Sequence, residues 1–154
     1  MAEISFSSSL IVRMKGEGLT AENVARRMAD VLELQGYVKD SYAQAIVDRE
    51  AVFPTALDMK GLNVAIPHCD IANVNAAAIC MGLLDTPVDW HKMDDPGDTC
   101  KVSVVVMLAL VEAHAHLDML QKVVSFVQNQ ELVARVLASA GPDEAYSLVG
   151  GCFA

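Results

Sequence analysis

The run KVSVVVMLAL, which occupies residues 101–110, carries the strongest strand signal in the chain. Four of its residues are β-branched valines and the run is almost continuously apolar, a pattern typical of a strand that is buried on both faces. The run is about half as long as the roughly 20 residues of a membrane-spanning helix. A strand buried in this way needs helices above and below it. We therefore predict an α/β fold with a central mixed β-sheet flanked by helices on both faces.

Weaker strand signals and clear helix signals surround this run. The further strands are predicted at residues 8–13, 64–66 and 76–84, with a polar loop at 87–98. The helices are predicted at residues 20–34, 41–52, 131–138 and 142–149, with one more from His116 onward. Thr20 is a suitable N-cap for the first helix, and Gly36 ends it. The helix from His116 has an apolar stripe formed by Leu117, Leu120, Val123, Val124 and Val127.

Length and composition favour one compact domain that spans residues 1–154. Of the 154 residues, 53% are hydrophobic, and the chain has no repeat and no low-complexity linker. The net charge of −9 argues against a nucleic-acid partner, which needs a basic face, and is compatible with a basic protein partner. The N-terminus lacks the pattern of a signal peptide, so we expect a soluble protein of the cytoplasm.

The sequence lacks the usual motifs for metals and nucleotides. The four cysteines, Cys69, Cys80, Cys100 and Cys152, have no CxxC spacing, so we predict reduced thiols and no zinc site. Neither the Walker phosphate-binding motif nor the GxGxxG motif occurs, so we expect no cofactor. If the protein transfers phosphoryl groups, it must receive them from another protein.

His68 is the first candidate for chemistry. It directly follows the predicted strand 64–66, and ligand crevices form at strand ends in α/β sheets. Pro67 has a fixed φ, which restricts the direction in which the chain leaves the strand. A histidine ring nitrogen is nucleophilic near neutral pH, so it can accept a phosphoryl group and pass it on. A histidine that merely caps a turn is the alternative, and the residues alone leave both open.

Two further histidines, His114 and His116, lie between the strand at 101–110 and the next helix. They are thus also at a strand end, where one of them can lie beside His68 and stabilise phosphoryl oxygens. A metal-type His-x-His pair and a plain helix start are the alternatives. His91, in the predicted polar loop, is expected at the surface.

Arg49 precedes the loop that leads to His68. Its planar guanidinium suits a phosphoryl group, and an ion pair with Asp48 or Glu50 is the structural alternative. Cys69 follows His68 directly, and we interpret it as a small structural residue rather than a nucleophile.

Four stretches, taken together, carry a family resemblance. They are residues 43–50 (AQAIVDRE), 63–68 (NVAIPH), 104–110 (VVVMLAL) and 115–120 (AHLDML). They resemble the EIIA component of the bacterial phosphoenolpyruvate-dependent sugar phosphotransferase system, in its fructose–mannitol class. The counterparts in that class are a helix ending in Arg-Glu, the phosphorylation motif Ile-Ala-Ile-Pro-His, a buried strand and a Glu-His-Leu-x-x-Leu segment. Order and spacing agree from about Ser9 to Ala138, which is nearly the whole chain.

The galactitol-type EIIA proteins are the closer likeness. The shared features are the run REAVFPT at 49–55, AIPHC at 65–69, the loop with Asp94 and Asp95, and the strand that follows it. Fructose and mannitol relatives usually have a glycine-rich loop where this chain has residues 53–61. Only Thr55 and Gly61 of that loop remain here, which favours the galactitol subgroup.

The resemblance implies a phosphoryl relay. HPr would hand a phosphoryl group to His68, which would pass it to a cysteine of the EIIB component. The EIIC membrane component would carry the sugar, with galactitol the expected one. Arg49 and His116 would support His68, although galactitol-type relatives need not keep a histidine at the place of His116. Because only a neutral His68 accepts, acceptance should weaken below about pH 6.

Two other hypotheses remain open. A regulatory EIIA domain of the nitrogen type would use phosphorylation of the same histidine to control a partner protein. A metal-binding domain would use His68, His114 and His116 as ligands, although the spacing offers no carboxylate or cysteine to complete the set. His114 matches no position of the EIIA family.

Overall fold

The sheet at the centre of the fold has five strands in the order β1-β4-β5-β3-β2. The computed structural model describes residues 4–16 and 18–153. The strands are β1 (Ile11–Met14), β2 (Ala56–Leu57), β3 (Asn63–Ala65), β4 (Ala78–His91) and β5 (Thr99–Ala109). β5 pairs antiparallel with β4 and parallel with β3, and β1 is parallel to β4, so the sheet is mixed as predicted.

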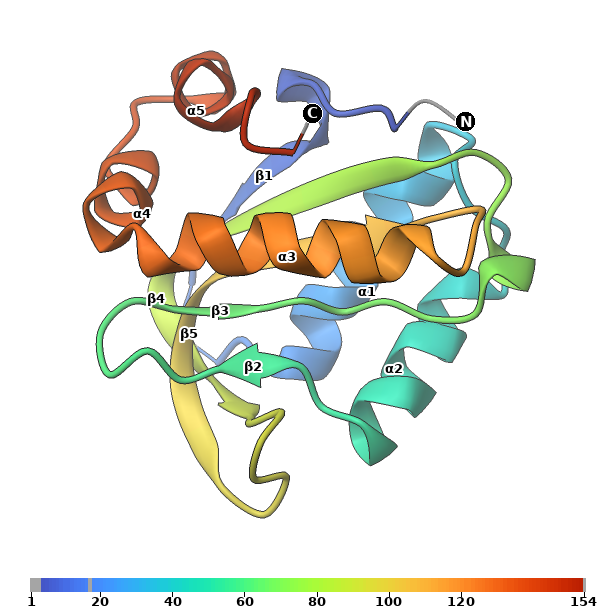
Figure 1. Ribbon diagram of the computed structural model, residues 1–154, viewed down its shortest axis with the longest axis horizontal. Coiled ribbons are helices and arrows are strands. Elements are labelled where there is room, and N and C mark those ends of the chain that lie inside the picture. The colour runs from blue at the N-terminus through green and yellow to red at the C-terminus, as the bar shows by residue number, and fades with distance from the viewer. Residues whose placement is uncertain (1–3, 17, 154) are drawn as a thin grey trace.

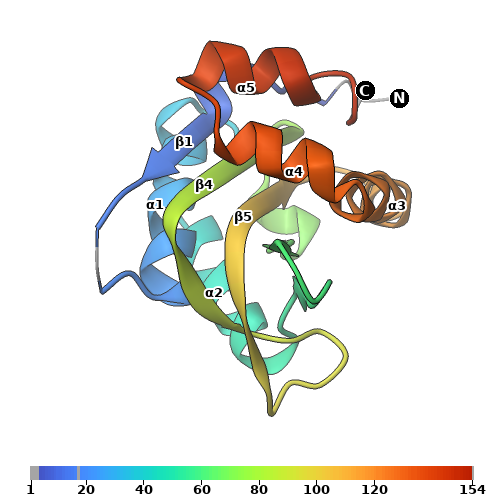
Figure 2. The same cartoon turned by 90° about the vertical axis from the view of Figure 1, so that its left-hand side faces the viewer.

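Helices cover both faces of this sheet (Figures 1 and 2). They are α1 (Ala21–Leu34), α2 (Tyr42–Val52), α3 (Ala115–Gln128), α4 (Gln130–Leu137) and α5 (Pro142–Val149). α1 and α2 pack on one face with one apolar cluster, and α3, α4 and α5 pack on the other face with a second cluster. No helix within residues 4–16 and 18–153 is long and apolar enough to cross a membrane.

The side chains of β5 belong to these two clusters in turn. Val104, Val106 and Leu108 pack with α3–α5, whereas Val105 and Met107 pack with α1 and α2. They alternate because successive side chains of a strand point to opposite faces of the sheet. All five are at most 1% exposed. The prediction that this strand is buried on both faces is therefore confirmed.

The ends of α1 follow the predicted signals. The Thr20 side chain accepts a hydrogen bond from the Asn23 N–H, and the Asn23 side chain accepts one from the Thr20 N–H, which is a reciprocal capping box. Gly36 has a φ of 85°. In this left-handed conformation the Gly36 N–H reaches the Glu33 carbonyl and the Tyr37 N–H reaches the Leu32 carbonyl, so the last carbonyls of the helix are satisfied.

Two predicted segments have wrong boundaries, and two short elements are not predicted. Residues 8–10 form a 3₁₀ helix, η1 (Ser8–Leu10), and the strand begins only at Ile11. The first part of the predicted polar loop at 87–98 is strand, because β4 continues to His91 and pairs with the start of β5. Two short elements, β2 and the 3₁₀ helix η2 (Ile71–Asn73), lie where no element is predicted.

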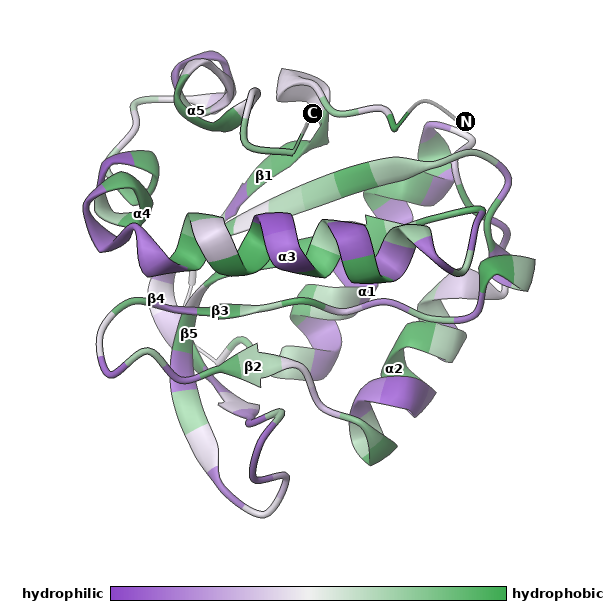
Figure 3. Ribbon diagram, in the orientation of Figure 1, coloured by the Kyte–Doolittle hydropathy of each residue, from purple (hydrophilic) through white to green (hydrophobic). Residues whose placement is uncertain are grey.

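The apolar stripe of α3 also differs from the prediction. Leu117 is 65% exposed, and the buried residues are Met119, Val123, Phe126 and Val127. The alternating green and purple bands of α3 in Figure 3 show this amphipathic pattern. The buried face is therefore rotated relative to the predicted stripe, and it leaves Leu117 at the surface beside His116.

Candidate functional site

The candidate site lies where three segments meet. The chain leaves β3 through Ile66 and Pro67 and presents His68, the first turn of α3 supplies His116, and the last turn of α2 supplies Arg49. Because β3 and β5 are parallel, both end at the same edge of the sheet, and the segments that follow them come together there. The site contains a cavity of about 350 Å³ lined by Arg49, His68, Cys69, Asp70, Ile71, Ala113 and His116.

Leu108 of β5 hydrogen-bonds to two of the segments that form the site. Its N–H donates to the Pro67 carbonyl at 2.9 Å, and its carbonyl accepts from the hydroxyl of Tyr42, the first residue of α2, at 2.8 Å. Tyr42 is fully buried. One residue of the central strand thus fixes both the segment that carries His68 and the helix that carries Arg49.

The ring of His68 is oriented by its own backbone. Its Nδ1 lies 2.8 Å from the Ile66 carbonyl oxygen. A carbonyl only accepts, so in the neutral ring Nδ1 carries the proton and Nε2 keeps its lone pair. Burial is the main cause that lowers the pKa of His68, and His116 and Arg49 lower it further. In this tautomer Nε2 is the ring nitrogen that is able to act as a nucleophile.

His116 lies directly beside His68. The centroids of the two rings are 5.2 Å apart, with an angle of 39° between their planes. The Nε2 atom of His116 is buried and has no hydrogen-bond partner in the described part of the chain. Burial, and then the charge of Arg49, lower the pKa of His116. When it is protonated, this nitrogen can donate a hydrogen bond to an anion beside His68.

Arg49 makes no ion pair with the residues that the structure describes, so the ion-pair alternative is wrong. Asp48 accepts from Gln44, and Glu50 accepts from Trp90 and Thr55. The Arg49 guanidinium instead lies 5.6 Å from the ring centroid of Phe53. Its five N–H donors therefore remain available at the cavity, where they suit a phosphoryl group.

His114 and His91 lie outside the site. His114 has a side chain that is 80% exposed, and its Nε2 is 3.0 Å from the Glu112 carboxylate. Within residues 4–16 and 18–153, no group of three or more His, Cys, Asp or Glu side chains is placed to hold a metal ion, which argues against the metal-binding hypothesis. His91 is exposed, as predicted, with its Nδ1 2.8 Å from the Pro96 carbonyl oxygen.

The Cys69 thiol is buried beneath the site. Burial raises its pKa to about 11, so the thiol stays protonated near neutral pH. A protonated thiol is a poor nucleophile, which agrees with the interpretation of Cys69 as a structural residue.

Sequence reasoning missed several residues around the site. Asp70 lines the cavity as an exposed carboxylate. Glu50 and Thr55 lie behind His68, where they hydrogen-bond to each other and to Trp90 and Ile66. Thr55 is one of the two residues that this chain shares with the glycine-rich loop of fructose and mannitol relatives. It is the one sequence signal that points to the hydrogen-bonded residues around Glu50.

A mixed α/β sheet with two adjacent histidines in a cavity at its edge favours a protein that carries a phosphoryl group on a histidine. The chain belongs to the family "Phosphoenolpyruvate-dependent sugar phosphotransferase system, EIIA 2", which matches residues 5–150. EIIA components are phosphotransferases that carry a phosphohistidine intermediate.

Two relatives of the chain are named for different sugars. A galactitol-specific EIIA component of Escherichia coli K12 is 26% identical over 130 residues, which cover 84% of this chain and 86% of the relative. A mannitol-specific enzyme IIA component of Halalkalibacterium halodurans is 30% identical over 146 residues, which cover 93% of each chain.

Among solved structures, the complex of IIAMTL with phosphorylated IIBMTL from Escherichia coli shares the fold. The TM-score is 0.77 at 20% identity, over 97% of this chain and 99% of that one. The predicted fold class, a mannitol-type EIIA fold, is confirmed.

Proposed function

We propose that the chain, as one EIIA domain over residues 1–154, relays phosphoryl groups in the cytoplasm from HPr to the cysteine of an EIIB component. EIIB in turn would serve an EIIC membrane component that carries the sugar. The observation that carries this proposal is the His68 ring, because its Nδ1 is bound to the backbone and its Nε2 is left as the nucleophile. EIIA domains work with an EIIB partner, as the complex of IIAMTL with phosphorylated IIBMTL illustrates.

In the proposed transfer, His68 Nε2 attacks the phosphorus of the donor's phosphohistidine. The new N–P bond forms as the N–P bond to the donor breaks, and the donor ring keeps the electron pair. The Nδ1 proton of His68 stays on its backbone bond throughout. Little other covalent chemistry is needed, so positioning and charge stabilisation dominate.

Two side chains and a helix end stabilise the phosphoryl oxygens in this proposal. The Arg49 guanidinium provides a planar set of donors. The negative charge that arrives raises the proton affinity of His116, whose Nε2 then donates a hydrogen bond. The cavity also lies at the N-terminus of the 14-residue helix α3, which favours anions.

Exposed apolar side chains next to the cavity offer a docking surface for the partner proteins. Phe53 and Val52 are each 63% exposed, and both line a hollow that continues from Arg49. Leu117, which directly follows His116, is 65% exposed. A partner that covers these side chains would also exclude water from the transfer.

Phosphoryl acceptance is expected to stay constant through neutral pH and to fall only at a pH below 6.5. Acceptance needs a neutral His68, and burial lowers the pKa of His68 below its ordinary value of 6.5. A lowered pKa keeps the ring neutral further into the acid range. A titration of the His68 ring by NMR measures this directly and does not involve the donor. A midpoint at or above pH 6.5 would contradict it.

Galactitol is the proposed sugar of the system. The galactitol-specific relative and the loop that contains Phe53 and Thr55 support this, whereas the mannitol-specific relative is the competing choice. The phosphorylated protein should pass its label at least about tenfold faster to a galactitol-type EIIB than to a mannitol-type EIIB, since wrong partners lose productive orientation.

Purified EIIB proteins of both types, mixed with the labelled chain, provide this test. Faster transfer to the mannitol type would overturn the galactitol assignment. No transfer to either type, from a protein that HPr labels well, would instead favour the nitrogen-type regulatory function.

A further inference from the structure

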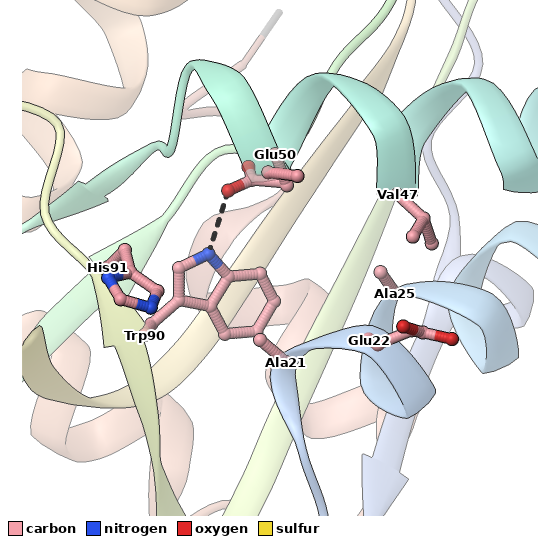
Figure 4. Close-up of a pocket in the computed structure, with 8 residues that line it drawn as sticks. Ala21, Glu22, Ala25, Val47, Glu50, Trp90 and His91 are labelled. Carbon is pink, nitrogen blue, oxygen red and sulfur yellow. Dashed lines mark hydrogen bonds between the residues drawn. The ribbon is translucent and has the colours of Figure 1, made fainter. Parts of the chain in front are cut away.

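A chain of hydrogen bonds connects Trp90, on β4, to the segment that carries His68. The Trp90 Nε1–H donates to Glu50 Oε2 at 3.1 Å, as the dashed line in Figure 4 shows. The Thr55 N–H donates to the same oxygen at 3.2 Å, and the Thr55 hydroxyl bonds to Glu50 Oε1. The Ile66 N–H donates to Thr55 Oγ1 at 3.0 Å. These bonds join β4, α2 and the loop before β2 to the end of β3.

The direction of each bond in this chain is fixed. An N–H group can only donate, so Thr55 Oγ1 accepts from Ile66, and the single hydroxyl proton of Thr55 goes to Glu50. Glu50 therefore accepts three hydrogen bonds. Burial raises the pKa of Glu50, and these three bonds oppose that effect. A carboxylate is the form that accepts all three.

Both ends of the Ile66–Pro67 segment are pinned by this arrangement. Thr55 holds the Ile66 N–H, and Leu108 holds the Pro67 carbonyl at 2.9 Å. Between these two anchors lies the Ile66 carbonyl, which accepts from His68 Nδ1. Thr55 is 3% exposed, so water does not readily replace its hydroxyl.

Glu50 also fixes the neighbouring Arg49. The two residues are adjacent in the last turns of α2, and the bond from Trp90, which is 1% exposed, ties that part of the helix to β4. Figure 4 shows Glu50 turned inward to the indole. One carboxylate thus anchors both the helix end that carries Arg49 and, through Thr55, the segment that carries His68.

We propose that Thr55 and Glu50 are positioning residues, which act through Ile66 to keep His68 in the tautomer with the proton on Nδ1. The proposal rests on the relay function given above. Neither residue contacts the phosphoryl group. Their effect is to aim the Ile66 carbonyl, which in turn selects the ring nitrogen that attacks.

The sharpest test compares Thr55→Val with Thr55→Ser. Valine has the shape of threonine but no hydroxyl, so the Ile66 N–H loses its partner, while serine keeps the hydroxyl. We expect Thr55→Val to slow single-turnover acceptance from phospho-HPr by about tenfold, and Thr55→Ser to stay within about twofold of the natural protein. Thr99→Val, the same change at an exposed strand position, is the matched control and should have no effect.

The tautomer of His68 gives a readout that a loss of stability alone would not change. Nitrogen-15 spectra of the folded proteins should show the Nδ1–H form in the natural chain and in Thr55→Ser, and a mixture of tautomers in Thr55→Val. An unchanged tautomer and rate in folded Thr55→Val would overturn the proposal.

Glu50→Gln provides a second variant in case Thr55→Val does not fold. An amide has only one acceptor oxygen for the three donors, so we expect a mixture of tautomers here as well. An unchanged spectrum would remove Glu50 from the role. The spectra need no donor protein, so they test the positioning role even if HPr fails to label the natural chain, which would refute only the relay.

Discussion

Arg49→Ala is expected to slow phosphoryl acceptance by His68 by about two to three orders of magnitude, the usual cost of removing a preorganised donor from a developing charge. The guanidinium lines the cavity and has no ion-pair partner among the described residues, so its donors are not committed elsewhere. A rapid-quench measurement of single-turnover transfer from phospho-HPr checks this result.

Two further variants make the Arg49 result specific. Arg49→Lys keeps the positive charge and loses the planar fork, so its rate should fall between those of Arg49→Ala and the natural protein. Arg27→Ala removes an exposed arginine from α1 and should leave the rate unchanged. If Arg49→Ala transfers as fast as Arg27→Ala, Arg49 has no part in the site.

The parts of the fold that were predicted correctly depend on local sequence. Residues 101–110 are apolar enough on both faces to predict a buried strand. The ends of α1 are equally local, because the Thr20 side chain caps its start and the left-handed backbone of Gly36 ends it. The charged residues at the end of β4 predict a loop, because charged side chains are typical of exposed segments. Val88 and Trp90 nevertheless alternate with exposed neighbours and pair with β5, and pairing across a hairpin is not local.

At the candidate site, too, some features follow from local sequence and others depend on contacts between distant residues. His68 and His116 could be placed together from the rule that parallel strands end at one edge of the sheet. The role of Glu50 could not, because its partner Trp90 is 40 positions away in the sequence. Sequence proximity suggests an ion pair of Arg49 with Asp48 or Glu50. In the fold, Glu50 instead points inward to Trp90, and Arg49 lies at the cavity.

His68→Ala is expected to abolish phosphorylation completely, because no other group in the described cavity combines nucleophilicity with access. In the proposed transfer His116 is protonated and is therefore no nucleophile, the Cys69 thiol is held protonated by a pKa of about 11, and Asp70 is a weak nucleophile for this transfer. His114→Ala, at an exposed histidine near the site, is the matched control and should keep its label.

Labelling with phosphoenolpyruvate, Enzyme I and HPr, compared between the natural chain and His68→Ala, tests the assignment of His68 as the phosphoryl acceptor most directly. The natural chain and His114→Ala should each gain acid-labile, base-stable phosphate, and His68→Ala should gain none. Labelling that survives in His68→Ala, or a natural chain that takes up no phosphate, would contradict the assignment.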